Sequence, residues 1–351
     1  MRFALDEAAE ALRDATAGVL RGYTLRGDAT GPWGKLAGGT WDKLADVGVL
    51  GTLVPEELGG LGLDENALVP VLEEIGYSGL PGPAAETIAV AAPLLAEAGL
   101  WTPDGGLVAV RAGDGDLIPY GEQVPRLVLD DRVFERDQLV LEECPAVDPL
   151  RPLARLTAIQ GAGAGLGGSR AGLGGSGAAA WERGVLGTAA LLCGLSRRML
   201  DMTVEYVKRR EQYGVPVGSF QAIKHALADA LVAVEFARPA VLAAAWAQSQ
   251  ASGSQASGSQ APESIAQLTR SSGANHVIDP RGAATSVAKV LASDAARLVA
   301  RTAIQCHGAM GYTTEYDLHL FAKRAWALAP SWGGADWHRA RIAEHLGVSD
   351  D

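Results

Sequence analysis

Residues 208–221, KRREQYGVPVGSFQ, interrupt a long helical pattern in the C-terminal half of the chain. Apolar residues recur at helical spacing over 181–210, and a second helical pattern runs over 220–248. Pro216 and the glycines around it account for the break, because proline lacks an N–H group and glycine disfavours a helix. The sequence therefore predicts two long helices joined by a short polar junction.

The junction carries side chains suited to a nucleotide-like ligand. Arg210 offers a fixed fork of donors that fits a phosphate. Gln212 and Gln221 can hydrogen-bond the edge of an uncharged heterocycle, and Tyr213 and Phe220 add flat apolar surfaces. On these residues alone, the alternative is a polar helix turn held by two aromatic side chains.

A second motif, Gln-Cys-His-Gly-Ala-Met-Gly-Tyr at 305–312, follows a helix predicted over 283–306. Small residues at a helix end let a ligand approach the backbone closely. The alternative is a helix C-cap with Gly311 in a left-handed conformation. Cys306 and His307 are adjacent, but no third orienting group is evident, so a Cys–His nucleophile is not predicted.

The rest of the chain divides into regions of different character. Residues 1–100 carry helical patterns at 4–24, around 41–49, at 64–77 behind a capping Asp64, and at 84–98. The predicted fold is α+β and multidomain, with an N-terminal all-α domain at 1–100 and a small, truncated β domain at 101–160. The β domain has β-prone runs at 107–111, 126–129, 138–141 and 153–158, and a glycine-rich linker follows it at 161–179. The chain ends in a C-terminal four-helix bundle at 180–351, which contains helices at 315–329 and 335–346 and a disordered low-complexity insertion at 249–275.

Glycine is concentrated in the predicted linker. The chain has 44 glycines, and nine of them lie in 161–177. Gly163, Gly165 and Gly168 spell a literal GxGxxG, which in a dinucleotide fold must open a helix. The following residues are too rich in glycine to form one. A flexible linker is therefore the better interpretation.

The composition bounds the class of protein. The net charge of −11 argues against nonspecific binding to nucleic acid or to an anionic membrane. Cys144, Cys193 and Cys306 are few and widely spaced, which predicts a reduced, cytoplasmic chain without structural zinc or another metal. The start is amphipathic and acidic, so no signal peptide is expected, and no apolar run reaches the roughly 18 residues of a membrane helix.

Taken together, three stretches resemble the acyl-CoA dehydrogenase family: LADVGVLGTLVPEELGGLGL at 44–63, KRREQYGVPVGSFQAIKHALADALVAVEFAR at 208–238, and AIQCHGAMGYTTEYDLHLFAKRA at 303–325. The resemblance implies a flavoprotein with FAD bound between subunits of a dimer within a tetramer, an acyl-CoA substrate and an electron-transfer acceptor. It implies roles in FAD binding as follows: Arg210 at the pyrophosphate, with Gln212 and Tyr213 beside it, Gln221 near the adenine side, and Gln305, Gly308 and Ala309 on the FAD of the neighbouring subunit, with Ala309 where a second glycine is usual.

The expected catalytic base is missing from this sequence. The family reaction removes an α-proton from an acyl-CoA thioester, and such a weak acid needs a positioned carboxylate. The usual glutamate lies in a Tyr-Glu-Gly segment, which corresponds here to 332–334 and places Gly333 at the base position. Some members carry the glutamate at the start of the first long C-terminal helix, which corresponds to Gly184. Neither glycine can take a proton.

The nearby carboxylates are poor substitutes. Glu182 is a candidate, but two residues along a helix turn a side chain by about 200°, away from the face of Gly184. Glu315 matches a family glutamate that is not the base, and a structural role is preferred for it. No Thr-Glu-Pro-type segment that would contact a flavin ring is found in the β region.

Retained cofactor motifs beside a missing base resemble one subunit of the α2β2 heterotetramers that act on bulky acyl-CoAs, of the fatty acid or sterol side-chain type. We therefore expect a base-lacking subunit that completes a partner's FAD site. Two alternatives stay open. One is an active homotetramer that uses an unrecognised base, Glu182 or Asp336. The other is a non-enzymatic scaffold or acyl-CoA-binding relic of the fold.

Overall fold

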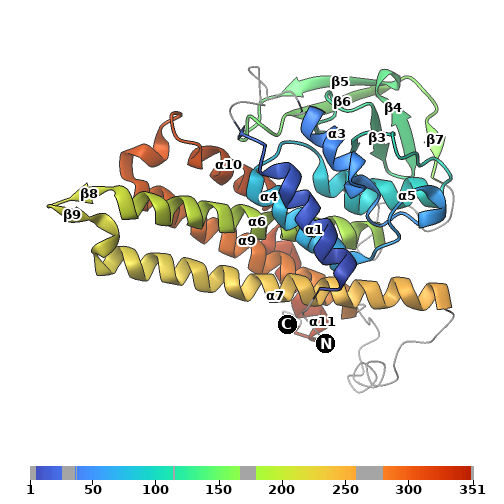
Figure 1. The fold of residues 1–351 in the computed structure, drawn as a ribbon. Coiled ribbons are helices and arrows are strands. Elements are labelled where there is room, and N and C mark those ends of the chain that lie inside the picture. Colours follow the sequence, from blue (N-terminus) through green and yellow to red (C-terminus); the bar gives the residue numbers. More distant parts are fainter. Residues whose placement is uncertain are drawn as a thin grey trace.

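The computed structural model describes residues 5–25, 36, 38–113, 115–166, 179–257 and 280–348. Within them the chain has three parts in sequence order: N-terminal helices, a small β region and long C-terminal helices (Figure 1). The fold class predicted from the sequence is therefore confirmed.

The N-terminal part is helical, and two of its helices begin at aspartate caps. The Asp6 side chain accepts the N–H of Ala9 at 2.8 Å, and the Asp64 side chain accepts that of Asn66 at 2.9 Å, as predicted for Asp64. The elements are α1 (Glu7–Leu20), α3 (Gly38–Asp46), the 3₁₀ turns η1 (Val49–Gly51) and η2 (Glu56–Leu58), α4 (Glu65–Ser78), the π-helix η3 (Ala85–Ala91) and α5 (Ala92–Glu97). The predicted helix at 84–98 thus begins as a π-helix, a form that often occurs at functional sites.

The β region contains two small sheets. In the first, the strand order is β1-β3-β4-β7, with β1 parallel to β3 and the other pairs antiparallel; in the second the order is β2-β6-β5, all antiparallel. The strands are β1 (Val108–Val110), β2 (Leu117–Pro119), β3 (Arg126–Leu129), β4 (Arg132–Glu135), β5 (Leu139–Cys144), β6 (Leu153–Ile159) and β7 (Ala164–Gly165), with the 3₁₀ turn η4 (Arg136–Gln138) before β5.

The linker predicted over 161–179 is wrong at its start. Residues 164–165 form β7 and pair with Arg132 and Val133 of β4, and Leu166 is buried. Arg132 also donates two hydrogen bonds, to the carbonyls of Ala162 and Gly163. These contacts extend the β region to residue 166. Most of the predicted linker, 167–178, lies outside the described residues.

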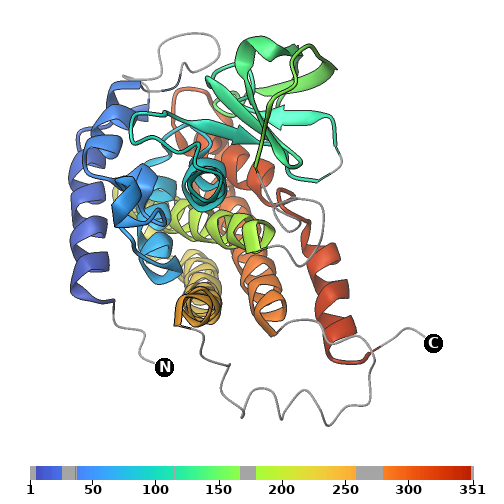
Figure 2. The same ribbon diagram turned by 90° about the vertical axis from the view of Figure 1, so that its right-hand side faces the viewer.

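The C-terminal part is built on α6 (Ala179–Arg209), which packs against α4, α7, α9 and α10. Figure 2 looks along α6, α7 and α9, with the β region above them and α1 and α11 on opposite sides. The further elements are the hairpin strands β8 (Glu211–Gln212) and β9 (Val215–Pro216), the 3₁₀ turn η5 (Val217–Ser219), α7 (Gln221–Ser257), α9 (Pro280–His307), the 3₁₀ turn η6 (Gly308–Tyr312), α10 (Leu318–Leu328) and α11 (Ala335–His345).

The disordered insertion predicted over 249–275 is also wrong at its start, because α7 continues to Ser257. Tertiary contacts are present at the point where the insertion was predicted to begin. Gln248 donates to the Glu182 carbonyl at 3.2 Å and to the Thr285 hydroxyl at 3.1 Å, and the Ser249 hydroxyl accepts from Asn66 at 2.9 Å. Residues 258–275 lie outside the described part of the chain.

Two glycines let α4 and α6 pack backbone to backbone. A Cβ at Gly76 would lie 2.3 Å from the Leu191 carbonyl oxygen, and one at Gly194 would lie 2.0 Å from that of Glu73. This crossing fixes the middle of α6. One end of α6 then lies beside the β region, and the other leads into the β8–β9 hairpin at the far side of the molecule (Figure 1). At 1.5 Å per residue, its 31 residues separate these ends by roughly 45 Å.

Candidate functional site

The helix junction encloses a cleft of about 360 Å³. The β8–β9 hairpin turns at Tyr213 and Gly214, whose φ angles of +56° and +77° are left-handed, and this turn leaves Tyr213 94 % exposed. The end of α9 and the turn η6 form the opposite wall. The lining residues are Tyr206, Arg210, Gln212, Tyr213, Val217, Phe220, Ile223, Gln305, Cys306, His307, Gly308, Ala309 and Met310.

Six of the seven residues predicted to bind FAD meet in this cleft. Arg210, Gln212 and Tyr213 come from the junction, and Gln305, Gly308 and Ala309 come from the end of α9 and the start of η6. The seventh, Gln221, is exposed at the first turn of α7 and does not line the cleft. The sequence analysis missed Tyr206, whose place one helical turn before Arg210 could have indicated it.

The chemistry of the cleft fits an anionic nucleotide. No carboxylate is among its lining residues. Among the described residues, no ion pair or side-chain hydrogen bond engages the Arg210 guanidinium. Tyr213 and Phe220 pack edge to face, with ring centroids 6.4 Å apart, and offer apolar surface beside this charge. An unpaired guanidinium next to aromatic rings is a suitable partner for a phosphate and a flat ring.

His307 belongs to the floor of the cleft. Its ring stacks on Tyr206 at 4.2 Å, and its Nδ1 lies 2.8 Å from the Ala303 carbonyl oxygen, so Nδ1 carries the proton and donates it. Burial lowers the pKa of His307 and keeps the ring neutral, and burial raises the pKa of the Cys306 thiol. This pair does not form a reactive thiolate, in agreement with the sequence analysis.

A second concave site lies at the other end of α6, and we call it the crevice. It has a volume of about 440 Å³ and lies between the β region, the first turn of α6 and the segment that joins α10 to α11. Its lining is mostly apolar and includes Val110, Ala112, Leu117, Pro119, Ala146, Val147, Leu153, Trp181, Trp326, Ala327, Pro330, Trp332 and Gly333, together with the polar Glu86, Asp148, Arg151 and Ser331.

Tryptophan rings lie against both glycines at which a catalytic base was expected. A Cβ at Gly184 would lie 2.6 Å from the Trp332 ring. Gly333 has φ of +92°, and a Cβ there would lie 2.8 Å from the Trp337 ring. Trp332 is 2 % exposed and packs edge to face on Trp181 at 5.3 Å. Packing therefore requires glycine at 184 and at 333.

The two substitute bases proposed from the sequence do not face the crevice. Glu182 is buried on another face of α6, where its carboxylate accepts from Arg341 at 2.5 Å, as its rotation from Gly184 predicted. Asp336 is exposed and pairs with Arg339 at 2.9 Å. Neither residue lines the crevice, so neither is placed to act on a ligand bound there.

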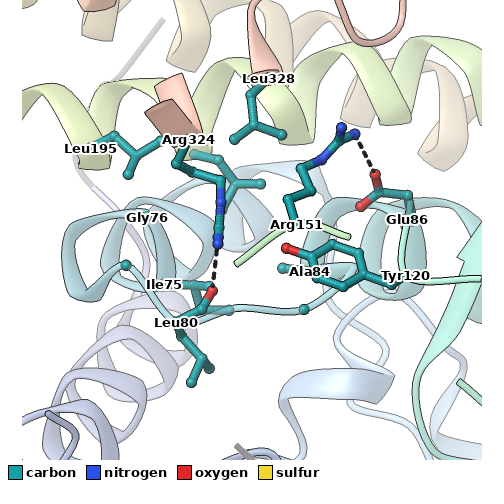
Figure 3. A pocket seen from close by; sticks show the side chains of 13 residues that line it. Ile75, Gly76, Leu80, Ala84, Glu86, Tyr120, Arg151, Leu195, Arg324 and Leu328 are labelled. Carbon is teal, nitrogen blue, oxygen red and sulfur yellow. Dashed lines mark hydrogen bonds and ion pairs between the residues drawn. The ribbon is translucent and has the colours of Figure 1, made fainter. Parts of the chain in front are cut away.

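The carboxylates that do line the crevice were missed by the sequence analysis. Asp148 is fully buried and engaged by Arg324 and by the N–H of Leu150. Glu86, on the π-helix, is 5 % exposed, and its Oε1 lies 3.7 Å from Nη2 of Arg151. Figure 3, which is drawn around a smaller pocket that the same pair lines, shows Arg151 turned toward Glu86. No local pattern marks Glu86, because its site is assembled from segments far apart in the chain.

A buried lysine and a buried imidazole hold the segment that carries Trp332. Lys289 on α9 donates to the carbonyls of Ala329 at 2.7 Å and Gly333 at 3.1 Å. His338 on α11 binds the Trp332 carbonyl through Nε2 and the Ser286 hydroxyl through Nδ1, both at 3.0 Å. Burial lowers the pKa of Lys289 to about 7, and burial with the nearby Lys289 charge lowers that of His338 to about 4.

The protein is expected to lose stability in acid through His338. The folded state keeps this ring neutral down to about pH 4, whereas the unfolded chain protonates it near 6.5. The neutral His338 ring therefore makes its full contribution to the free energy of unfolding above pH 6.5. As the pH falls toward 4, the free energy of unfolding decreases by about 2–3 kcal/mol. Urea unfolding at pH 7 and pH 4.5 should show this loss in the wild type and a smaller one in His338→Gln. An equal loss in both proteins would contradict the assignment.

Among the described residues, no group of three or more His, Cys, Asp and Glu side chains is placed to hold a metal ion. One helix, α7 over Gln221–Gln250, is long and apolar enough to cross a bilayer by length and composition. It packs against α4, α6 and α9.

The α–β–α order, the cleft at a helix junction and the crevice beside the β region define a helical-bundle fold with two ligand-sized sites. Comparison with known proteins gives the family. Residues 6–100 match the acyl-CoA dehydrogenase N-terminal domain, and residues 176–347 match the acyl-CoA dehydrogenase C-terminal domain. The chain belongs to the acyl-CoA dehydrogenase family, whose members are oxidoreductases and flavoproteins.

Several relatives resemble most of the chain. Acyl-CoA dehydrogenase IpdE2 of Mycolicibacterium smegmatis is 30 % identical over 81 % of this chain and 80 % of its own length. IpdE2 of Mycobacterium tuberculosis is 29 % identical over 81 % and 79 %. Among solved structures, the ChsE4-ChsE5 complex of M. tuberculosis has a TM-score of 0.75 at 22 % identity and covers 100 % of both chains. A Tcur3481-Tcur3483 steroid acyl-CoA dehydrogenase variant has a TM-score of 0.74 at 23 % identity, with 97 % and 98 % covered.

Proposed function

We propose that this chain is a base-lacking subunit of a heteromeric acyl-CoA dehydrogenase and that its junction cleft completes the FAD site of a partner subunit. The packing at Gly184 and Gly333 carries this proposal. A carboxylate at Gly184 would collide with the Trp332 ring, and one at Gly333 with the Trp337 ring, which supports a chain without a base at either family position. Without a base, the α-proton of a thioester stays in place.

The cleft supports the cofactor part of the proposal. Bound FAD supplies the acceptor for the β-hydride. Toward it, Arg210 would neutralise the pyrophosphate, and Gln305 would hydrogen-bond polar groups of the nucleotide. Gly308 has φ of +58° with open space where a Cβ would be, which lets a ligand approach the backbone.

The separation of the two sites supports a role toward a neighbouring subunit. The cleft and the crevice lie at opposite ends of α6, roughly 45 Å apart. One dinucleotide cannot bind Arg210 with one end and reach the crevice of the same chain with its flavin ring. A flavin whose phosphates bind at Arg210 must therefore place its ring in another subunit.

An exposed apolar stripe on α7 is consistent with such a neighbour. Leu231, Val232 and Phe236 are 49 %, 52 % and 70 % exposed on this helix. Apolar side chains gathered on one exposed face are typical of subunit contacts. Two of the similar solved structures bear the names of two different chains, ChsE4-ChsE5 and Tcur3481-Tcur3483, and the second is called a steroid acyl-CoA dehydrogenase. We propose a bulky acyl-CoA substrate of this kind.

Co-expression with candidate partner subunits tests the proposal. The purified complex should contain both chains in equal amounts, carry flavin and oxidise an acyl-CoA, whereas this chain alone should not oxidise one. Arg210→Met should lower the flavin content of the complex about tenfold, because a charged contact to phosphate is lost. Arg209→Met is the matched control, since Arg209 pairs with Glu205 and does not line the cleft.

The alternative function is an active enzyme with an unrecognised base. Glu86 favours it, because this residue is a buried carboxylate at the wall of the crevice. Acyl-CoA oxidation by this chain alone, abolished by Glu86→Gln, would favour that alternative and overturn the base-lacking role. A complex without any flavin absorbance would instead favour a non-enzymatic scaffold.

A further inference from the structure

The polar side of the crevice contains an ion pair with unused hydrogen-bonding capacity. Arg151 is 7 % exposed, and its Nη2 alone serves both neighbours, the Ser331 hydroxyl at 3.0 Å and Glu86 at 3.7 Å. Its Nε is buried without a hydrogen bond. Within the described part of the chain, no hydrogen bond engages Nη1 of Arg151 or the Glu86 carboxylate.

In the neighbouring ion pair of Asp148 and Arg324, more of the hydrogen-bonding capacity is used. Asp148 accepts from Arg324 and from the N–H of Leu150, and Arg324 also donates to the Leu150 carbonyl at 2.9 Å. Buried polar groups are normally satisfied in this way, and each exception calls for an explanation. The Glu86–Arg151 pair has spare donors and acceptors at the wall of a ligand-sized space.

The charge of the pair selects the group that could use them. Glu86 and Arg151 neutralise each other, so a carboxylate added beside them would leave one negative charge unbalanced in an apolar crevice. A hydroxyl avoids this cost, since it can accept from the Arg151 guanidinium and donate to the Glu86 carboxylate. A ketone can accept from the guanidinium only.

We infer that the crevice binds an acyl group whose hydrocarbon part carries an uncharged oxygen group, either a hydroxyl or a ketone. Arg151 and Glu86 would hydrogen-bond this group. The inference rests on the proposed function, because it takes the crevice as an acyl-binding site. The rest of the crevice is apolar and lined by three tryptophans, Trp181, Trp326 and Trp332, which suits the hydrocarbon. Its volume of about 440 Å³ is that of a small-molecule site.

Three CoA esters of similar length test the inference by calorimetry on the full chain: octanoyl-CoA, 8-hydroxyoctanoyl-CoA and 7-carboxyheptanoyl-CoA. The hydroxylated ester should bind about tenfold or more tighter than octanoyl-CoA, because a site built to hydrogen-bond a hydroxyl discriminates against its absence. The carboxylated ester should bind more weakly than either.

The double variant Glu86→Gln with Arg151→Met should abolish this preference, so that octanoyl-CoA and 8-hydroxyoctanoyl-CoA bind with similar affinities. It removes both charges together, so neither is left buried alone. Arg13→Met on α1, which pairs with Asp14 at the surface, should keep the wild-type preference. If the double variant fails to fold, the ratio of the wild-type affinities for 8-hydroxyoctanoyl-CoA and octanoyl-CoA still tests the inference.

Equal affinities of the wild type for octanoyl-CoA and 8-hydroxyoctanoyl-CoA would overturn the inference; the adjacent enclosed cavity of about 20 Å³ could then hold a water that satisfies Arg151. Tighter binding of the carboxylated ester, or no binding of any ester, would overturn it as well. The flavin content of the complex measures the proposed function separately, so the two can fail independently.

Discussion

Gly184→Glu is expected to give a protein that is about 3 kcal/mol or more less stable than the wild type and that still does not oxidise acyl-CoA by itself. The new side chain would restore a carboxylate at a position where some family members carry their base. Its Cβ, however, would lie 2.6 Å from the Trp332 ring, inside a contact that real Cβ atoms do not make. Either the ring or the helix must move, and the carboxylate would be buried without a partner.

Unfolding in urea and a flavin-linked oxidation assay would measure both parts of this prediction. Gly18→Ala on α1 is a control for adding a side chain to a helical glycine, since its Cβ would meet its nearest neighbour at an ordinary 3.5 Å. Adding Trp332→Ala to Gly184→Glu should recover part of the stability by opening the clash. A stable, active single variant would show that Trp332 gives way easily and that glycine at 184 is not imposed by packing.

Local patterns in the sequence were sufficient for the helices, whereas the residues that meet in the cleft were assigned through the family resemblance. Apolar periodicity located α6, α9 and α11 to within a few residues, and the Asp64 cap was correct, because caps and amphipathic faces are properties of adjacent residues. In the structure, Arg210 and Gln305 lie close together because each stands at the end of a long helix on the same side of the bundle.

What the sequence analysis missed depends on contacts between distant segments. Gln248 and Ser249 contact other helices at the point where the insertion was predicted to begin, and β7 pairs with β4. Low complexity and glycine density describe a segment but not its neighbours. The same holds for Glu86, whose place in the crevice depends on segments more than sixty positions further along, as its pairing with Arg151 shows.

The two glycines at the base positions show the limit most clearly. From the sequence, Gly184 and Gly333 signify only an absent carboxylate. In the structure, each is a condition for packing, because Trp332 covers the first and the left-handed backbone and Trp337 constrain the second. Lys289 and His338 then fix the segment between α10 and α11 that carries Trp332. The absence of a carboxylate at these two positions is thus tied to the packing around them, and we expect that one substitution does not restore a working base.

Arg324→Met is expected to have the largest effect on stability, a loss of about 3–5 kcal/mol. Burial alone would lower the pKa of Arg324, but the charge and hydrogen bond of Asp148, together with smaller effects of neighbouring groups, raise it. The guanidinium also donates to the carbonyls of Leu150 at 2.9 Å and Leu80 at 3.4 Å. It therefore joins α10, the loop before β6 and the end of α4, and its removal would leave Asp148 buried without its ion-pair partner.

Thermal and urea unfolding would measure this loss, and Arg155→Met provides a control within the β region. Arg155 pairs with Asp116 at 2.9 Å, but both side chains are about half exposed, so its loss should change stability by about 0.5 kcal/mol or less. Adding Asp148→Leu to Arg324→Met should restore part of the stability, because the stranded charge is then removed. A loss below about 1 kcal/mol for Arg324→Met alone would mean that water reaches Asp148. Because Asp148 lines the crevice and Arg324 fixes it, such a result would also mean that this wall of the crevice is not rigid.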